Sequence, residues 1–164
     1  MNNIIPVQIK ADFEIVADLA KEIWTEHYTP IIGWQQVEYM LEKFQSATEI
    51  ENQIKEGIRY YLILYQDSAV GYFSFRINKD FVFLSKLYLL KSARGNRLGG
   101  LALDFIEAKA RELKLQKIKL TVNKYNTNSI KAYEKMGFEN IESIIQDIGN
   151  GYVMDDYVLE KVIK

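Results

Sequence analysis

The chain has 164 residues and 48% of them are hydrophobic, which is enough for one domain with a sizeable buried core. Its 21 basic and 22 acidic residues leave a net charge of −1, so charge gives no reason to expect binding to nucleic acid or to an anionic membrane. The sequence contains no cysteine and His27 is its one histidine. This excludes disulfides, a cysteine nucleophile and a metal centre built from several histidines.

The ends and linkers of the sequence carry no targeting or membrane signal. Residues 1–6 lack the basic stretch and apolar core of a secretion signal, and no apolar run approaches the about 20 residues that a membrane span needs. We therefore expect a cytoplasmic protein that does not enter a membrane. No linker rich in proline or serine, internal repeat or low-complexity segment interrupts the chain, so we predict a single domain over residues 1–164.

The first third of the chain is predominantly helical in pattern. Residues 4–9 form a short apolar run, predicted as an edge strand, and Asp12 can cap the helix that follows. Apolar residues over 15–24 recur at helical spacing, and we expect this helix to stop near Pro30. A second amphipathic segment follows, and then a capping box at residues 46–49 predicts a short third helix.

The remainder of the chain alternates between strand and helix patterns. Three successive strand patterns come first, and short turns between them predict a meander. A closing hairpin is predicted around Gly149-Asn150-Gly151. The order favours a central mixed sheet with helices on both faces. The predicted strands are 59–65, 70–77, 81–90, 117–122, 141–148 and 152–162, and the predicted helices are 98–113 and 126–136.

A basic loop with glycines, residues 94–100, lies at the mouth of the predicted helix 98–113. Backbone N–H groups at a helix N-terminus have no acceptor within the helix, and they attract an anion together with the positive end of the helix dipole. Arg94 and Arg97 add side chains that bind phosphate oxygens. The loop is a candidate phosphate site, although an ordinary strand–helix turn with two solvated arginines has the same pattern. It matches neither the P-loop nor the G-x-G-x-x-G fingerprint.

A second candidate element spans residues 126–138. Asn126 lies just past a predicted strand, where its amide can bond an extended ligand, and Tyr133 lies two helical turns later and can project toward the same edge. A structural role fits equally: Asn126 then caps a short helix, Gly137 ends it, and Tyr133 and Phe138 pack in the core.

Together, these two elements resemble the signatures of the GCN5-related N-acetyltransferase (GNAT) superfamily, which uses acetyl-CoA. The family loop reads Gln/Arg-x-x-Gly-x-Gly/Ala, and residues 94–99 match it except at Arg97, where glycine is usual and a side chain resists positive φ. Residues 87–89 resemble the strand that pairs with pantetheine. The resemblance covers residues 58–162 well and the N-terminal helices only in their placement. It implies an α/β (α+β) fold with a mixed, mostly antiparallel twisted sheet of about seven strands and helices on both faces.

The resemblance implies acetyl-CoA as co-substrate and no metal. The pyrophosphate is expected on the amides of residues 94–99, with Gly100 just inside the helix. The family opens its sheet beside the central strand, so a backbone N–H near Leu89 is expected to face the thioester carbonyl, a donor worth about 3 kcal/mol. The residues expected to bind acetyl-CoA are Leu87, Tyr88, Leu89, Arg94, Gly95, Asn96, Arg97, Leu98, Gly99, Gly100, Asn126, Ser129 and Lys135.

Tyr133 matches the family's general acid. With an ordinary pKa of about 10, a tyrosine stays protonated at neutral pH and can donate a proton to the leaving thiolate. The general base is left open, because family members often place a glutamate on the central strand, where this chain offers Ser85 and Lys86. The candidates from the helical third are Glu26, His27 and Glu38.

The family's acceptor site lies over the helical third. The residues expected to line it are Trp24, His27, Tyr28, Trp34 and Tyr39. Their spacing also fits a core stripe, the interpretation favoured for Trp24, while a helix-surface or capping role is favoured for His27. The pair Asp155-Asp156 can attract a cationic amine, although such a pair is more often a solvated strand edge. The segment 147–157 is similar to that of a bacterial subgroup that includes polyamine N-acetyltransferases.

We therefore predict an acyl-CoA-dependent N-acyltransferase that acetylates a primary amine of a small molecule, such as a polyamine, or of a peptide or protein. Direct attack within a ternary complex agrees with the lack of cysteine. The alternatives are a CoA-binding module whose catalysis has decayed, suggested by Arg97 and the missing strand carboxylate, and a pure interaction domain. Nucleic-acid binding ranks last because the charges are mixed. A homodimer is also predicted, since the long final strand can pair across an interface.

Overall fold

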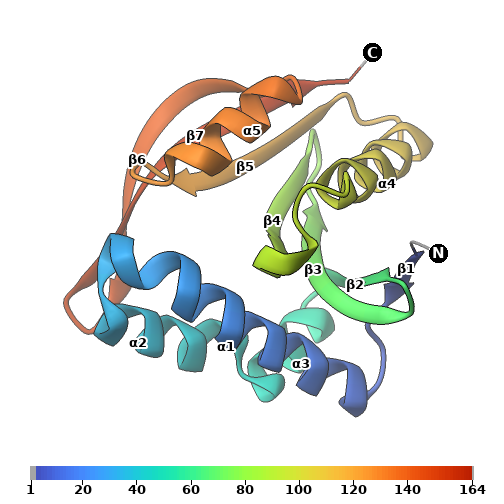
Figure 1. Cartoon of the computed structure of the whole chain (residues 1–164). Helices are drawn as coiled ribbons and strands as arrows, with labels where there is room; N and C mark the ends of the chain where they lie inside the picture. The colour runs from blue at the N-terminus through green and yellow to red at the C-terminus, as the bar shows by residue number, and fades with distance from the viewer. Residues whose placement is uncertain (1–2, 164) are drawn as a thin grey trace. The chain divides into compact units, whose positions relative to one another are not determined.

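The structure is a computed structural model that describes residues 3–163 (Figure 1). Its strands hydrogen-bond in the order β1-β2-β3-β4-β5-β7-β6 as one seven-stranded sheet. The pairing of β4 with β5 is parallel, whereas β1–β2, β2–β3, β5–β7 and β6–β7 are antiparallel. The predicted fold class, an α/β protein with a mixed sheet of seven strands, is thereby confirmed.

The elements follow the predicted order closely. The strands are β1 (Asn3–Pro6), β2 (Arg59–Tyr65), β3 (Ser68–Ile77), β4 (Val82–Leu89), β5 (Lys117–Asn123), β6 (Glu139–Gly149) and β7 (Tyr152–Val162). The helices are α1 (Lys10–Ile32), α2 (Trp34–Gln45), α3 (Ala47–Lys55), η1 (Lys91–Ala93), α4 (Leu98–Glu112) and α5 (Thr127–Lys135).

Contacts within the chain define two compact units. The first comprises Met1–Arg76 and Lys86–Leu103, and the second comprises Ile77–Ser85 and Asp104–Lys164. The single domain over residues 1–164 stays a prediction, and its residues 1, 2 and 164 lie outside the described residues.

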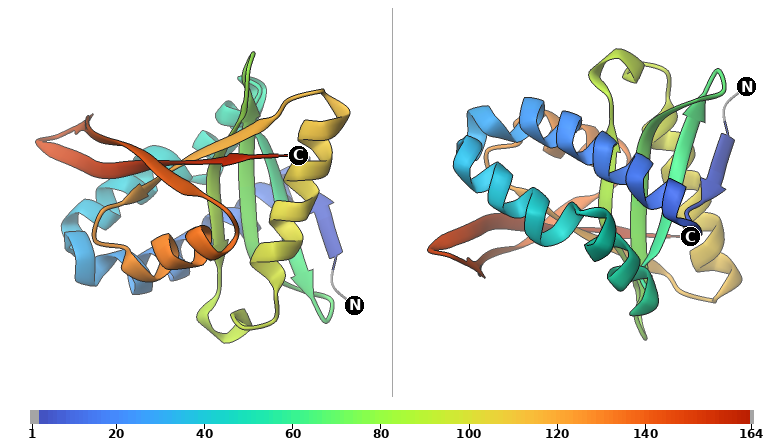
Figure 2. Two further views of the ribbon diagram at one scale, coloured as in Figure 1. Left: turned by 90° about the horizontal axis from the view of Figure 1, so that it is seen from above. Right: turned by 90° about the horizontal axis from the view of Figure 1, so that it is seen from below.

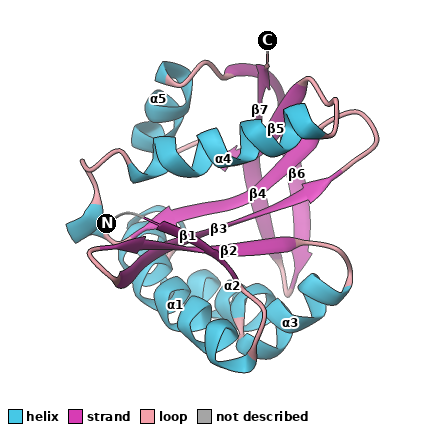
Figure 3. Cartoon of the chain, turned by 90° about the vertical axis from the view of Figure 1, so that its right-hand side faces the viewer, coloured by secondary structure: helices cyan, strands magenta, loops and turns pink. Residues whose placement is uncertain are grey.

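In the first unit, three helices pack beside the antiparallel strands β1, β2 and β3 (Figure 3). The helix α1 contacts both α2 and α3 (Figure 2). A buried amide, Gln45 at the end of α2, ties this helical layer to the strands, because it accepts a hydrogen bond from Tyr72 Oη at 2.6 Å and donates one to Tyr60 Oη at 3.0 Å. Burial raises the pKa of Tyr60 to about 12, so both phenols stay neutral and polar in this network.

The predictions for the two ends of α1 are confirmed. The helix runs two residues past Pro30 to Ile32, and Gly33, with φ 86°, ends it. The turn after Pro30 is kept by the bond from Gly33 N–H to the Thr29 carbonyl at 3.0 Å. Asp12 caps the helix from its first turn, because its carboxylate accepts bonds from the N–H groups of residues 8 and 9, the second of which is the N-cap residue.

The second unit is built on β5, β7 and β6. The alternation along β5 buries Ile118, Leu120 and Val122 on one face, as the polar–apolar pattern of the sequence predicts. On this face Lys161 of β7 forms an ion pair with Glu107 of α4 at 2.9 Å. Because β7 lies between β5 and β6, the final strand has partners on both sides, so the prediction that it pairs across a dimer interface is wrong.

Candidate functional site

The predicted phosphate loop forms the entrance to α4 in the first unit. The loop turns at Gly95, with φ 86°, and α4 begins at Leu98. The first bond of the helix runs from Leu101 N–H to the Arg97 carbonyl at 3.0 Å. The N–H groups of residues 98–100 precede this bond, so they have no acceptor within the helix and add to the positive end of its dipole. The loop therefore has the donors that an anion needs.

The surroundings of this helix start leave room for a ligand. A Cβ atom built on Gly99 or Gly100 would meet no atom within 4 Å. Asn96 holds the turn in place, because its Nδ2 donates to the Ala93 carbonyl at 2.9 Å and its Oδ1 accepts from Tyr65 Oη at 3.3 Å. Accessible backbone amides on a fixed turn fit the diphosphate of a coenzyme A molecule.

Arg97, the one departure from the family loop, takes the conformation that glycine favours. Its φ is 59°, in the left-handed region where a side chain costs about 1–2 kcal/mol. The substitution therefore leaves the backbone path intact and adds a cationic side chain at the helix entrance. Arg94 directs its guanidinium to the Leu89 carbonyl, with Nη2 at 3.5 Å from the oxygen.

The residues expected to pair with pantetheine, 87–89, form the end of β4. The strand approaches β3 closely here, since a Cβ atom on Gly71 would lie 2.4 Å from the Tyr88 carbonyl oxygen. The N–H of Leu90 continues this contact by bonding the Val70 carbonyl at 2.8 Å. The side chains of Leu87, Tyr88 and Leu89 are all half-buried.

An aromatic cluster joins this part of β4 to α1. Tyr88 Oη lies 3.1 Å from Tyr28 Oη, and the Tyr88 ring also meets the Trp24 ring edge-on at 5.4 Å between centroids. Trp24 is 3% exposed, which confirms its interpretation as a core residue. His27 meets the Tyr28 ring edge-on at 4.9 Å and is half-buried. Of the five residues expected to line the acceptor site, the structure brings these three together.

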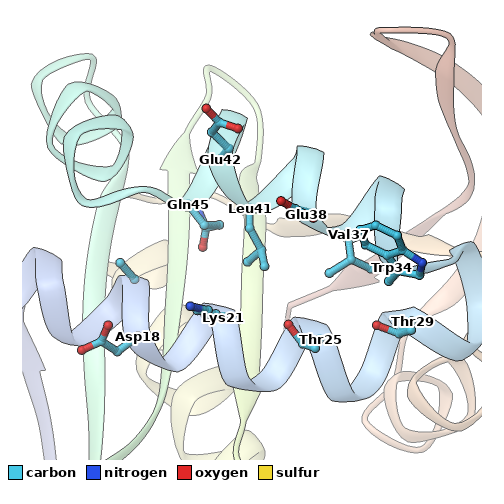
Figure 4. A pocket seen from close by; sticks show the side chains of 11 residues that line it. Asp18, Lys21, Thr25, Thr29, Trp34, Val37, Glu38, Leu41, Glu42 and Gln45 are labelled. Carbon is cyan, nitrogen blue, oxygen red and sulfur yellow. The ribbon is translucent and has the colours of Figure 1, made fainter.

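A fourth residue, Trp34, lies elsewhere, in a hollow of about 560 Å³ between α1 and α2 (Figure 4). The fifth, Tyr39, lies on α2, where its hydroxyl accepts a hydrogen bond from Lys43 Nζ at 3.3 Å. Its indole is 62% exposed. The base candidate Glu38 lines the same hollow, whereas Glu26 is exposed and lies 4.0 Å from the ammonium of Lys91. The hollow is lined by Ala17, Asp18, Lys21, Thr25, Thr29, Trp34, Val37, Glu38, Leu41, Glu42 and Gln45.

The second signature lies in the second unit, at the end of β5 and in α5. Asn126 is buried and occupies the N-cap position, but its side chain makes no capping bond, so it is not the ordinary cap that the structural interpretation required. Tyr133 is half-buried and meets the Phe138 ring edge-on at 5.5 Å. Gly137, with φ 100°, follows the end of α5 as predicted. Ser129 is half-buried and Lys135 is exposed on α5.

The pair in β7 departs from the interpretation favoured for it. Asp156 is 1% exposed and β7 is an inner strand, so the pair is not a solvated edge. Asp155 forms an ion pair with Lys124 at 2.7 Å. Burial and the neighbouring Asp155 carboxylate raise the pKa of Asp156 to about 6. The sequence pattern does not reveal the burial of this carboxylate, because the burial depends on the strand order.

Lys86 is a second group whose character the sequence could not reveal. It lies on β4, and its Nζ is 5.9 Å from the centroid of the Tyr60 ring. Burial lowers the pKa of Lys86 to about 8. In the sequence, Lys86 is a lysine within an apolar strand. The one indication of its unusual environment is its position two residues before Tyr88, on the same side of the strand.

A sheet of this order, with an open helix start after its central strand, is the arrangement that the resemblance to the GNAT superfamily implied. The sequence profile of the Acetyltransferase (GNAT) family matches residues 16–138. The chain belongs to this family, and acetyl-CoA is its co-substrate. The prediction of the GNAT superfamily and of its co-substrate is confirmed.

Solved structures of other acetyltransferases share the fold of the chain. The structure is similar to PaiA N-acetyltransferase from Thermoplasma acidophilum in complex with coenzyme A, with a TM-score of 0.83, 20% identity and 99% of each chain covered. It is also similar to ribosomal-protein-S18-alanine N-acetyltransferase from Escherichia coli, with a TM-score of 0.74, 13% identity, and 100% of this chain and 95% of that chain covered. No curated protein sequence matches the chain.

A third similar structure has a higher identity over a shorter stretch. It is Naa50 from Arabidopsis thaliana in complex with the bisubstrate analogue CoA-Ac-MVNAL, with a TM-score of 0.56 and 29% identity over 62% of this chain and 71% of that chain. Within residues 3–163, no helix is long and apolar enough to cross a membrane. The same residues contain no group of three or more histidine, aspartate or glutamate side chains placed to hold a metal ion.

Proposed function

We propose that the protein acetylates a primary amine by direct attack within a ternary complex, and that Tyr133 is the general acid. The observation that carries this proposal is the helix start at residues 98–100, whose N–H groups precede the first bond of α4 beside two glycines with open space. Such a site suits a diphosphate. When bound, acetyl-CoA supplies an activated thioester.

Three parts of the chain have roles in this proposal: the loop before α4, the end of β4 and Tyr133 of α5. The N–H groups of residues 94–100 hold the diphosphate, and the backbone of residues 87–89 orients the pantetheine arm. The Tyr133 hydroxyl donates its proton to the leaving thiolate, since a phenol is protonated at neutral pH. The edge contact with Phe138 supports this role, because it fixes the plane of the Tyr133 ring.

The acceptor is proposed to be an amine on an alkyl chain or at a peptide N-terminus. The contact between Tyr28 and Tyr88 supports this class, because aromatic faces and hydroxyl groups suit a cationic amine on an apolar stem. The similar structures include a ribosomal-protein-S18-alanine N-acetyltransferase and a complex with the bisubstrate analogue CoA-Ac-MVNAL, so the panel of acceptors has to include peptides. The resemblance of segment 147–157 adds polyamines to the panel.

A thiol-release assay tests the proposed function. The purified chain with acetyl-CoA is expected to release thiol in the presence of at least one member of a panel of polyamines, aminoacyl compounds and peptides with free N-termini. Stabilisation by acetyl-CoA in a thermal shift experiment separates the alternatives. Stabilisation without thiol release supports the decayed CoA-binding module, and the lack of both supports an interaction domain.

We predict that Tyr133→Phe lowers kcat by about 100-fold, the lower end of what proton transfer contributes, and leaves the Kd of acetyl-CoA within twofold. Steady-state kinetics and calorimetric titration measure the two quantities. Tyr125→Phe is the matched control, because Tyr125 is exposed just before α5 and should keep full activity. An unchanged kcat for Tyr133→Phe removes this residue from the mechanism.

Three further expectations stay predictions: the polyamine subgroup, the cytoplasmic location and the homodimer. The exclusion of nucleic acid as a partner is likewise a prediction from the balance of 21 basic and 22 acidic residues. Sedimentation velocity of the purified chain, with and without acetyl-CoA, tests the homodimer.

A further inference from the structure

The hollow between α1 and α2 lies wholly within the first unit, because every residue that lines it falls between residues 17 and 45. Its volume of about 560 Å³ is within the range of ligand sites in proteins. Several of its lining side chains are exposed, so a ligand can reach it from solvent (Figure 4). The proposed acetylation assigns no role to this hollow.

The lining residues follow one side of each helix. On α1 they recur every four positions from Ala17 to Thr29, and residues at this spacing lie one above the other on a helix. The hollow therefore runs along the two helices and not into the core. The rise from Ala17 to Thr29 gives it a length of about 18 Å.

Apolar side chains of α2 form one part of the lining. Val37 is 2% exposed and Leu41 is half-buried, whereas Trp34 is 62% exposed beside them. An indole in this position leaves apolar area for a ligand to cover, and tryptophan is enriched among the residues that dominate binding energies. The hollow therefore suits a ligand with apolar side groups.

Charged side chains form the exposed rim of the hollow. Asp18, Glu38 and Glu42 provide three carboxylates, and Lys21 provides one ammonium. Within residues 3–163, none of these four side chains takes part in an ion pair, so the excess negative charge is not balanced by the protein itself. Charge complementarity favours a cationic ligand.

The dimensions of the hollow favour an extended chain as its occupant. A volume of 560 Å³ over about 18 Å gives an average cross-section of about 30 Å², whereas a helix about 10 Å across needs about 80 Å². About five residues of an extended peptide span this length, and their side chains alternate between two sides. Thr25, which is exposed in the lining, offers a hydroxyl group to the peptide backbone.

We propose that this hollow binds an extended basic segment of a partner protein, in which arginine or lysine side chains alternate with apolar ones. The cationic side chains pair with the carboxylates of the rim, and the apolar ones cover Trp34, Val37 and Leu41. A polyamine would satisfy the carboxylates but has no side groups for the apolar part of the lining. This binding is separate from the proposed acetylation and does not depend on it.

The test uses a peptide that cannot be acetylated. Its sequence is Arg-Leu-Arg-Val-Arg-Leu-Arg, with an acetylated N-terminus and an amidated C-terminus, so it contains no primary amine. Calorimetric titration of the whole purified chain at low salt is expected to show saturable binding of one peptide, which weakens as salt is added. The same peptide with glutamate in place of arginine is expected not to bind.

Matched variants locate the binding. Asp18→Asn combined with Glu42→Gln should raise the Kd of the arginine peptide about tenfold, the effect of losing two exposed ion pairs. Glu14→Gln combined with Glu22→Gln removes the same charge from exposed positions of α1 outside the hollow and should keep the Kd within twofold. Trp34→Ala should also raise the Kd about tenfold.

Three results would overturn the proposal. The first is a lack of binding, and the second is an equal loss in the two double variants, because the attraction would then be general and not local. The third is an unchanged Kd for Trp34→Ala, or spermidine that binds as tightly as the peptide and displaces it, since charge alone would then account for binding. None of these results bears on the proposed acetylation, which the thiol-release assay tests.

Discussion

Arg97 shows how one residue departs from a family pattern without changing the path of the backbone. Its φ of 59° is a conformation that glycine adopts freely and that costs an L-residue about 1–2 kcal/mol. The chain accepts this cost at the entrance of α4, next to the amides proposed to hold a diphosphate. A cationic side chain there adds attraction for phosphate that glycine cannot supply.

This account predicts different stabilities for two variants that both lack the guanidinium. Arg97→Gly should be more stable than Arg97→Ala by about 1 kcal/mol, because only glycine relieves the left-handed conformation. Urea unfolding of the two variants measures this difference. Both should bind acetyl-CoA more weakly than the original chain, and to the same extent.

Arg94 provides the control for the backbone effect. Its φ is −67°, where alanine is at no disadvantage, so Arg94→Gly should be no more stable than Arg94→Ala. Equal stability of the two Arg97 variants would show that the left-handed conformation of this residue stores no strain.

At the scale of elements, β3 and β4 approach each other more closely at Gly71 than a side chain permits. A Cβ atom at this position would lie 2.4 Å from the Tyr88 carbonyl oxygen and 2.7 Å from Leu89 Cδ2. The oxygen belongs to the backbone of a paired strand and cannot rotate away. Glycine is therefore required here by contact rather than by backbone conformation.

We predict that Gly71→Ala destabilises the protein by about 1–3 kcal/mol, the range found for overpacked sites. Gly100→Ala is the matched control, since its Cβ would meet no atom within 4 Å and alanine favours a helix by up to about 1 kcal/mol. The urea concentration at the unfolding midpoint should be lower for Gly71→Ala than for the original chain. For Gly100→Ala it should be higher or unchanged. A Gly71→Ala variant with the original midpoint would mean that the two strands separate without cost.

At the scale of the whole molecule, the features that could be predicted from the sequence are the helices and strands that follow from local patterns. The alternation of Ile118, Leu120 and Val122 marked β5, and the glycines before Leu101 marked the start of α4. The order of the strands does not follow from such patterns, because it depends on contacts between distant segments. The burial of Asp156 was missed for this reason, since β7 had to be known to lie between β5 and β6.

Only part of the candidate site could be predicted from the sequence, because the rest depends on contacts between distant segments. Residues 94–100 could be located because a strand, a basic loop and a helix start follow one another in the chain. The acceptor residues could only be assigned to the helical third, and the structure separates Trp34 from the cluster around Tyr28. The helix α1 runs two residues past Pro30 because the loss of one hydrogen bond does not end a helix whose next turn is bonded.

The free energy of unfolding of the whole protein should depend on the charge of the half-buried Lys86. Burial lowers the pKa of this lysine from 10.5 to about 8, so between these values the unfolded chain binds more protons than the folded one. Stability from this group therefore rises as pH increases from 8 to 10.5, and its charged form opposes folding below pH 8. Lys86→Met removes the charge and keeps an apolar side chain of similar length.

We predict that Lys86→Met is more stable than the original chain at pH 7 and that this advantage shrinks steadily between pH 8 and 10.5, where the lysine of the folded chain is already neutral. Urea midpoints of both proteins, taken at half-unit steps over this range, measure the difference and cancel the titration of other groups. The exposed Lys91, changed to Met, should give a difference that does not depend on pH. A constant advantage for Lys86→Met would mean that the lysine is charged in the folded protein throughout this range, and that its cost is one of packing rather than of charge.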